Sequence, residues 1–110
     1  MPESTLDLWK DVPPGDVGTK LLYENEQVKV WEFVLDPGEA IPMHTHQQDY
    51  LFHVYQGGTL EVTYPAEAKT EPKRVELKAG DVRFAAKGGR HMARNVSDKR
   101  YVEVLVELKK

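Results

Sequence analysis

The chain has 110 residues and a mass of 12.6 kDa, which predicts a single domain. It has 15 lysines and arginines and 18 aspartates and glutamates, which gives a net charge of −3. This charge argues against nucleic acid as a partner, because phosphate binding needs a basic surface. There is no cysteine, so disulfides, thiolate metal sites and cysteine nucleophiles are excluded. Any metal ligand must come from His, a carboxylate or Tyr.

The first 20 residues are rich in Pro, Gly and Asp and predict a loosely structured N-terminal arm, which Leu8 and Trp9 can pin to the rest of the protein. No basic stretch followed by an apolar core opens the sequence, and no apolar run approaches the ~18 residues of a membrane span. We therefore expect a cytoplasmic protein with no membrane partner, in which residues 21–110 form one domain.

Beyond the arm, strand-like runs alternate with turn signals at the spacing typical of β-sandwiches and barrels, and stripes with the helical period are missing. Asp36-Pro37-Gly38 has the Pro and Gly of a type II turn, and the stretch from Pro65 to Pro72 predicts an exposed loop. The sequence predicts an all-β fold with strands near residues 20–24, 28–36, 41–46, 49–56, 59–64, 73–77, 82–86, 91–96 and 100–109.

Two of these strands differ in how their apolar side chains are distributed over the two faces. In residues 28–35 both alternation classes contain large apolar groups, so we expect cover on both sides. In residues 101–108 we expect Glu103 and Glu107 on the exposed face. The expected buried face consists of Val102, Val104, Val106 and Leu108. A small β-sandwich cannot cover every such face by itself, so we predict a homodimer joined through strand faces.

Three of the four histidines are candidate metal ligands by their positions in the sequence. His44 and His46 are two residues apart on an expected strand, so both imidazoles project from one face and can share an ion. Such a pair is weak evidence by itself, because polar strand faces carry it by chance. The residues around the pair decide the interpretation.

The histidine pair belongs to a longer pattern of fixed spacings. The pattern runs through Gly38, His44, His46, Tyr50 and Gly57, and later through Gly80, Gly88, His91 and Asn95. In spacing, residues 38–95 resemble the two motifs of the cupin family, which has Glu where this chain has Tyr50 and Pro where it has Ala86. Residues 44–52, HTHQQDYLF, are similar to a group of small bacterial cupins, some of which are linked to β-alanine degradation.

The resemblance implies a single-domain double-stranded β-helix, the jelly-roll barrel of the cupins. Alternate side chains of each strand then face the barrel interior, where His44, His46 and His91 converge from two strands. Such a set would hold one divalent ion of Fe, Mn, Ni or Zn and leave positions open for water, substrate or O₂. A barrel that has lost its metal is the alternative.

Tyr50 is the main departure from the family pattern. A neutral phenol leaves the full charge of the ion in place, so the site should favour anionic, chelating ligands. Tyr50 is also the candidate catalytic residue, carrying a proton to or from a reacting oxygen, with a barrel-wall aromatic as the alternative. Strand alternation turns Asp49 away from the histidines and gives His53 a surface or interface position.

Cationic side chains flank the second motif. Arg90 and Arg94 are candidates for binding a substrate carboxylate, with a solvated basic loop as the alternative that we favour for Lys87. We expect the core or the barrel lining to include Trp31, Met43, Tyr64, Phe84 and Met92.

Two function classes follow. The first is a metal-dependent enzyme that acts on a small organic acid or chelating anion, dioxygenase-like with iron and isomerase- or lyase-like with another metal. The second is a non-catalytic module that binds a small ligand and serves regulation, because a fold by itself does not decide function. The three matching ligand positions favour the enzyme.

Overall fold

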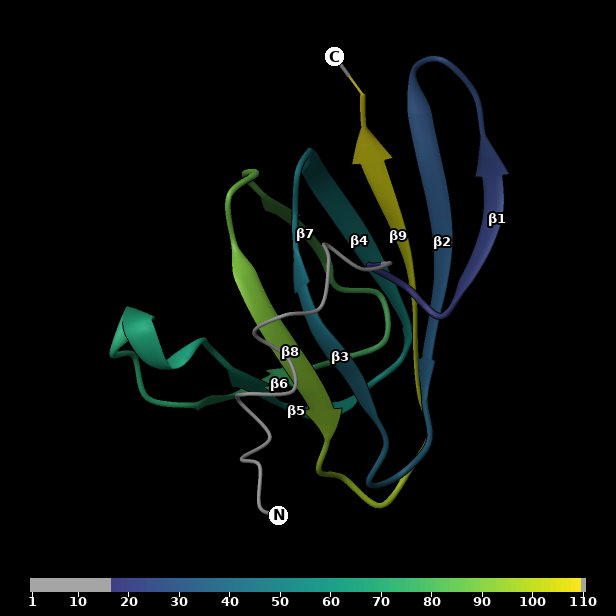
Figure 1. The fold of residues 1–110 in the computed structure, drawn as a ribbon. Coiled ribbons are helices and arrows are strands. Elements are labelled where there is room, and N and C mark those ends of the chain that lie inside the picture. Colours follow the sequence, from purple (N-terminus) through teal and green to yellow (C-terminus); the bar gives the residue numbers. More distant parts are fainter. Residues whose placement is uncertain (1–16, 110) are drawn as a thin grey trace.

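The structure is a computed structural model that describes residues 17–109 (Figure 1). Most of the predicted arm, with Leu8 and Trp9, lies outside the described residues. Residues 17–109 form nine strands and one short 3₁₀ turn: β1 (Lys20–Glu24), β2 (Val28–Leu35), β3 (Ala40–Thr45), β4 (Asp49–Gln56), β5 (Gly58–Thr63), η1 (Ala66–Ala68), β6 (Lys73–Leu77), β7 (Val82–Ala85), β8 (Arg90–Asn95) and β9 (Tyr101–Leu108). Every predicted strand is present, with its ends within one residue of the expected positions.

The strands form two antiparallel sheets that pack face to face. The five-stranded sheet has the order β1-β2-β9-β4-β7, and the four-stranded sheet has the order β3-β8-β5-β6 (Figure 1). Neighbouring strands such as β2 and β9 come from distant parts of the sequence, as expected for a jelly roll. The main core between the sheets contains Phe33, Leu35, Ile41, Val54, Leu60, Leu77, Ala93 and Tyr101.

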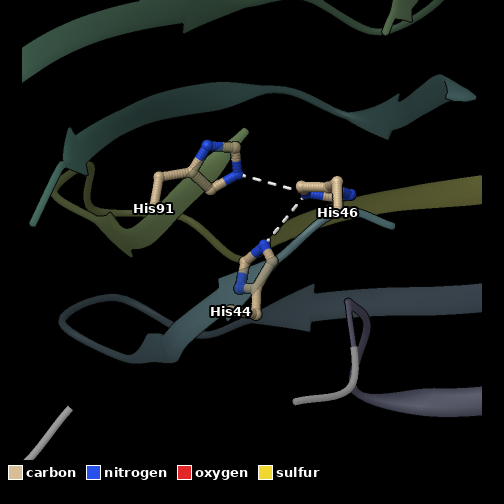
Figure 2. Close-up of side chains that lie close together, drawn as sticks. All are labelled: His44, His46 and His91. Atoms are coloured by element: carbon tan, nitrogen blue, oxygen red, sulfur yellow. Dashed lines mark hydrogen bonds between the residues drawn. The ribbon is translucent and has the colours of Figure 1, made fainter. Parts of the chain in front are cut away.

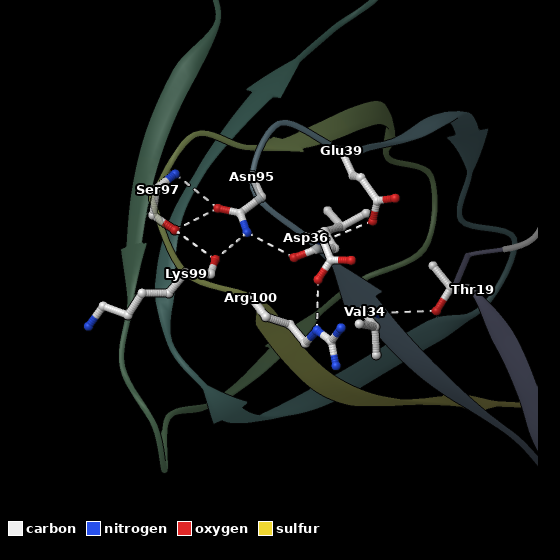
Figure 3. Close-up of polar contacts among 9 residues, drawn as sticks. Thr19, Val34, Asp36, Glu39, Asn95, Ser97, Lys99 and Arg100 are labelled. Atoms are coloured by element: carbon white, nitrogen blue, oxygen red, sulfur yellow. Dashed lines mark hydrogen bonds and ion pairs between the residues drawn. The ribbon is translucent and has the colours of Figure 1, made fainter.

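The turn between β2 and β3 has the predicted chemistry. The Glu39 N–H donates to the Asp36 carbonyl at 2.9 Å, and Gly38 has a φ of +86°, which the third position of a type II turn requires. The Asp36 carboxylate also accepts a hydrogen bond of 2.7 Å from Nε of Arg100, so the turn is tied to the start of β9 (Figure 3).

Asn95, at the end of β8, holds the neighbouring turns together (Figure 3). Its fully buried side chain donates through Nδ2 to the carbonyls of Leu35 at 2.8 Å and Lys99 at 2.7 Å. Its Oδ1 accepts from the N–H and the hydroxyl of Ser97 at 2.9 and 2.6 Å. Because every donor and acceptor of the amide has a partner, the ends of β2 and β8 keep a fixed spacing.

The buried face of β9 is the opposite of the predicted one. Tyr101, Glu103, Leu105 and Glu107 point inward and are at most 7% exposed, whereas the alternating apolar residues expected there are only half-buried. Two hydrogen bonds offset part of the free-energy cost of burying the glutamates. The Tyr101 hydroxyl donates to Glu103 at 2.5 Å, and the indole Nε1 of Trp31 donates to Glu107 at 2.7 Å.

The outward side of the five-stranded sheet carries these apolar residues instead, with Glu32 and His53 on either side of Val104. Cross-strand pairing places Val30 beside Val106, Val106 beside Leu51, and Leu51 beside Phe84. We call this surface the outer valine face, and it consists of Val30, Val34, Leu51, Val82, Phe84, Val102, Val104 and Val106.

The predictions for core residues are confirmed with one exception. Trp31, Met43 and Met92 are buried, and Tyr64 lines a cavity between the sheets. Phe84 was expected in the core but is 63% exposed, because it lies on the outward side of the edge strand β7. Among residues 17–109, no helix has the length and apolar character that would let it cross a membrane.

Candidate metal centre

The pairing of β3 with β8 brings the histidines of the two motifs together. His44 lies directly opposite His91, and the register shifts between Ile41 and His44, so β3 carries one extra residue there. Pro42 sits in this bulge, where a residue without an N–H is tolerated. The bulge re-aims the side chain of His44 into the barrel, and the Pro42 carbonyl contacts its Nδ1 at 2.9 Å.

His46 follows the last residue of β3 and is held by the loop before β8. Its N–H donates to the Gly89 carbonyl at 2.8 Å, and its carbonyl accepts from the Gly88 N–H at 2.8 Å. Gly88 has a φ of +107°, a backbone conformation that favours glycine. The two glycines therefore continue the β3–β8 ladder and fix the imidazole of His46 beside those of His44 and His91.

The three imidazoles converge on one point (Figure 2). Nε2 of His46 lies 3.0 Å from Nε2 of His44 and 3.2 Å from Nε2 of His91. Nitrogens bound to a metal at about 2.1 Å and at right angles are about 3 Å apart, so the spacing suits adjacent ligands of one ion. Within residues 17–109, these are the only His, Cys, Asp and Glu side chains that form a group of three or more able to share an ion.

The proton positions also fit a cation. The Pro42 carbonyl can only accept, so neutral His44 carries its proton on Nδ1 and turns the lone pair of Nε2 toward the cluster. His46 can donate from Nε2 to only one of its two neighbours, and its buried Nδ1 has no hydrogen-bond partner among the described residues. A metal ion between the imidazoles would accept all three Nε2 lone pairs, so the residues fit such an ion.

Burial keeps the imidazoles in the form that binds metals. Burial lowers the pKa of His44, and it is the main cause that lowers the pKa of His46 to about 3 and that of His91 to about 4. The neighbouring imidazoles lower the last two further. The three side chains are therefore neutral near pH 7, and neutral imidazole is the ligand form.

Tyr50 packs against this cluster from β4. Its ring stacks on His46 with centroids 3.9 Å apart and planes at 14°, and it is 8% exposed. Burial, with smaller contributions from Glu103 and Tyr64, raises the pKa of Tyr50 to about 12, so the hydroxyl keeps its proton. The structure thus places Tyr50 in the cavity wall, with a hydroxyl that keeps its proton.

The other predicted polar residues point elsewhere. Asp49 accepts a hydrogen bond from the Lys87 N–H at 2.9 Å, and His53 lies on the outward side of β4, both as expected. Arg90 donates to the Thr45 hydroxyl at 2.8 Å, and the exposed Arg94 donates to the carbonyl of Gly38 at 2.6 Å. Neither arginine lines the cavity beside the histidines, and their predicted role in substrate binding stays a prediction.

A cavity of about 200 Å³ lies between the sheets beside the histidines. Its apolar walls come from Val17, Phe33, Phe52, Leu60, Val62, Val75, Leu77, Ala93 and Leu105. Its polar lining includes Glu103 and Arg83, which the sequence analysis did not identify as site residues. The available signal was that Glu103 shares its strand face with Tyr101 and Leu105, two side chains that favour burial.

Fold and site together define a small jelly-roll protein with a candidate three-histidine metal centre. A sequence model of the cupin domain matches residues 31–106, and the chain belongs to the cupin family. The comparison with curated proteins finds no match.

Solved structures agree with this assignment. The chain is 29% identical to a cupin domain from Bordetella pertussis, with a TM-score of 0.76 over 90% of this chain and 98% of that one. It is 15% identical to the protein BH2720 from Bacillus halodurans, with a TM-score of 0.67 over 100% of this chain and 81% of that one. The polyketide cyclase RemF from Streptomyces resistomycificus is 17% identical, with a TM-score of 0.59 over 78% of this chain and 57% of that one. The last two share the fold alone.

Proposed function

We propose that this cupin is a metal-dependent enzyme that acts on a small organic acid or a related chelating anion. The observation that carries the proposal is the convergence of three neutral imidazoles, through Nε2, at the wall of an apolar cavity. The ligands are His44, His46 and His91, and the ion is Fe, Mn, Ni or Zn. When bound, the ion supplies Lewis-acid activation of an anionic oxygen, and iron adds O₂ chemistry.

The chain's own residues supply the rest of the site. The apolar walls lower the local dielectric constant beside the histidines, which strengthens electrostatic contacts made there. Tyr50 carries a hydroxyl that stays protonated beside His46 and can donate that proton to a ligand oxygen. No carboxylate joins the three imidazoles among the described residues, so the ion keeps its full charge and favours anionic ligands.

Replacement of one histidine tests the metal site. We expect the wild-type protein, purified without added metal, to hold close to one divalent ion per chain by elemental analysis. His46→Ala removes the central ligand and should reduce the occupancy to well below stoichiometric. His53→Ala is the matched control, because His53 lies on the outward side of β4 and should leave the metal content unchanged.

Full metal retention in His46→Ala would contradict the metal site. O₂ consumption and product analysis with a panel of small acids then distinguish the enzyme from a binding module. Turnover that requires the metal supports the enzyme. Saturable binding of acids without turnover would overturn catalysis in favour of a regulatory ligand-binding cupin.

A further inference from the structure

A buried glutamate that is hydrogen-bonded to a buried tyrosine lines the same cavity as the histidines. Glu103 on β9 is 4% exposed, and its Oε1 accepts a hydrogen bond of 2.5 Å from the Tyr101 hydroxyl. Tyr101 itself is fully buried and packs edge-on against Phe33. The carboxylate is therefore held in place from one side, and its residue lines the cavity on the other.

The second carboxylate oxygen of Glu103 has no protein partner in the described part of the chain. Oε2 accepts no hydrogen bond from residues 17–109, and no cation there forms a salt bridge with it. Arg83, which also lines the cavity, is half-exposed and lies 3.9 Å from Asp81 instead. A carboxylate can accept several hydrogen bonds, so Glu103 presents unused acceptor capacity to the cavity.

Glu103 and the histidine cluster lie at different depths of the barrel. Glu103 pairs with Val54, which is four residues along β4 from Tyr50, the residue stacked on His46. Four residues of strand correspond to about 13 Å between these backbone positions. The lining is otherwise mainly apolar, although Tyr50, Tyr64 and Arg83 also belong to it, so a ligand that reaches from the histidines to Glu103 meets largely apolar walls.

We propose that Glu103 is a specificity-determining residue that accepts a hydrogen bond from the far end of the ligand. This inference rests on the proposed function, in which the histidine-bound ion holds the near end. The substrate class is then a small acid or chelating anion with an apolar middle and a hydroxyl or N–H at the opposite end. A ligand without this donor leaves a buried carboxylate poorly satisfied, which costs binding free energy.

A series of aromatic hydroxamates tests the inference, because hydroxamate chelates divalent metals whatever its substituent. The probes are benzohydroxamates with 4-hydroxy, 4-fluoro or 4-carboxy groups, and their affinities for the zinc-loaded protein are measured by calorimetry at about pH 7.8. Burial raises the pKa of Glu103 to about 7, so the carboxylate is ionised under these conditions. Hydroxyl and fluorine are similar in size, and only the hydroxyl donates.

We expect the wild type to bind the 4-hydroxy probe about tenfold more tightly than the 4-fluoro probe, as for a hydrogen bond to a charged group. Glu103→Gln should reduce this ratio to about threefold or less while the metal content stays the same. The matched control is Glu107→Gln, a buried glutamate on the same strand face that bonds Trp31 and does not line the cavity. It should leave the ratio unchanged.

Each outcome decides between the two proposals. Failure of the 4-fluoro probe to bind would overturn the open chelating site of the proposed function, and this inference with it. Equal binding of the 4-fluoro and 4-hydroxy probes would overturn the role of Glu103 alone. Tightest binding of the 4-carboxy probe would assign specificity to Arg83 instead. If Glu103→Gln does not fold, Glu103→Asp withdraws the carboxylate and should reduce the same ratio.

Discussion

At the scale of single residues, Tyr50 distinguishes this site from the cupin motif, which has a glutamate in its place. The ring stacks on His46 at 3.9 Å, so the aromatic face contributes to packing, and the hydroxyl keeps its proton because the pKa of Tyr50 is raised to about 12. A phenol of this kind adds no charge to the centre. In the proposed metal centre, Tyr50 therefore affects both the net charge of the site and the proton available beside it.

Tyr50→Phe and Tyr50→Glu separate these two roles. Tyr50→Phe keeps the stacked ring and should leave metal content unchanged, while turnover of any substrate falls by about 10²–10⁴-fold if the hydroxyl transfers a proton. Tyr50→Glu adds a negative charge, so we expect tighter metal binding and azide affinity weaker by about tenfold. Metal content is measured by elemental analysis and azide binding by spectroscopy of the cobalt-loaded protein.

Imidazole is the control ligand for the charge effect, since it is neutral and should bind both proteins with more similar affinity. Equal azide affinity of the wild type and Tyr50→Glu across a range of salt would contradict the charge explanation. Tyr50 would then be a wall residue only.

At the scale of elements, the site depends on where β3 and β8 meet. The bulge at Pro42 lets His44 face His91 across the ladder, and the Gly88–Gly89 loop extends the same ladder to His46. The opposite end of β8 is held by Asn95, whose side chain joins the end of β2 to the turn before β9. Both ends of the strand that carries His91 are thus fixed by hydrogen bonds, between backbone groups at one end and from the Asn95 side chain at the other.

We expect Asn95→Ala to lower the free energy of unfolding by roughly 2–4 kcal/mol, because it leaves buried partners such as the Leu35 carbonyl unsatisfied. In a domain of this size the loss corresponds to a fall in Tm of roughly 10 °C or more, measured by thermal unfolding. Ser97→Ala is the control. It removes the hydroxyl contact to Asn95 and a longer one of 3.3 Å to the Lys99 carbonyl, and should cost about 1 kcal/mol. A smaller loss for Asn95→Ala than for Ser97→Ala would contradict this account.

At the scale of the whole molecule, the outer valine face has no cover within the described chain. Its central row, Val30, Val106, Leu51 and Phe84, crosses four strands without a polar side chain. An apolar sheet face of this kind is typical of interaction surfaces. The homodimer predicted from the sequence would use it, and its two-fold symmetry would pair the face with itself.

Val106→Asp places a charge at the centre of that row and should convert the dimer to a monomer. Light scattering at micromolar concentration should give twice the chain mass for the wild type and close to 12.6 kDa for the variant. Thr59→Asp, on the outward side of the four-stranded sheet, is the control and should leave the mass unchanged. A wild-type mass of 12.6 kDa at this concentration would rule out the dimer.

The sequence by itself determined the features that depend on neighbours along the chain. Turn residues such as Gly38 mark where strands end, since their backbone demands are local, and the spacing of His44, His46 and His91 identified the candidate ligands. Only the tertiary structure decided which side of β9 faces the interior. A two-residue period shows that a strand has two different faces, but it does not show which face meets the other sheet. In β9 the face with the glutamates is buried and the face with the valines points outward, which is the reverse of the usual rule that apolar faces are buried. For that reason Glu103 emerged as a cavity residue only when β9 was placed between β2 and β4.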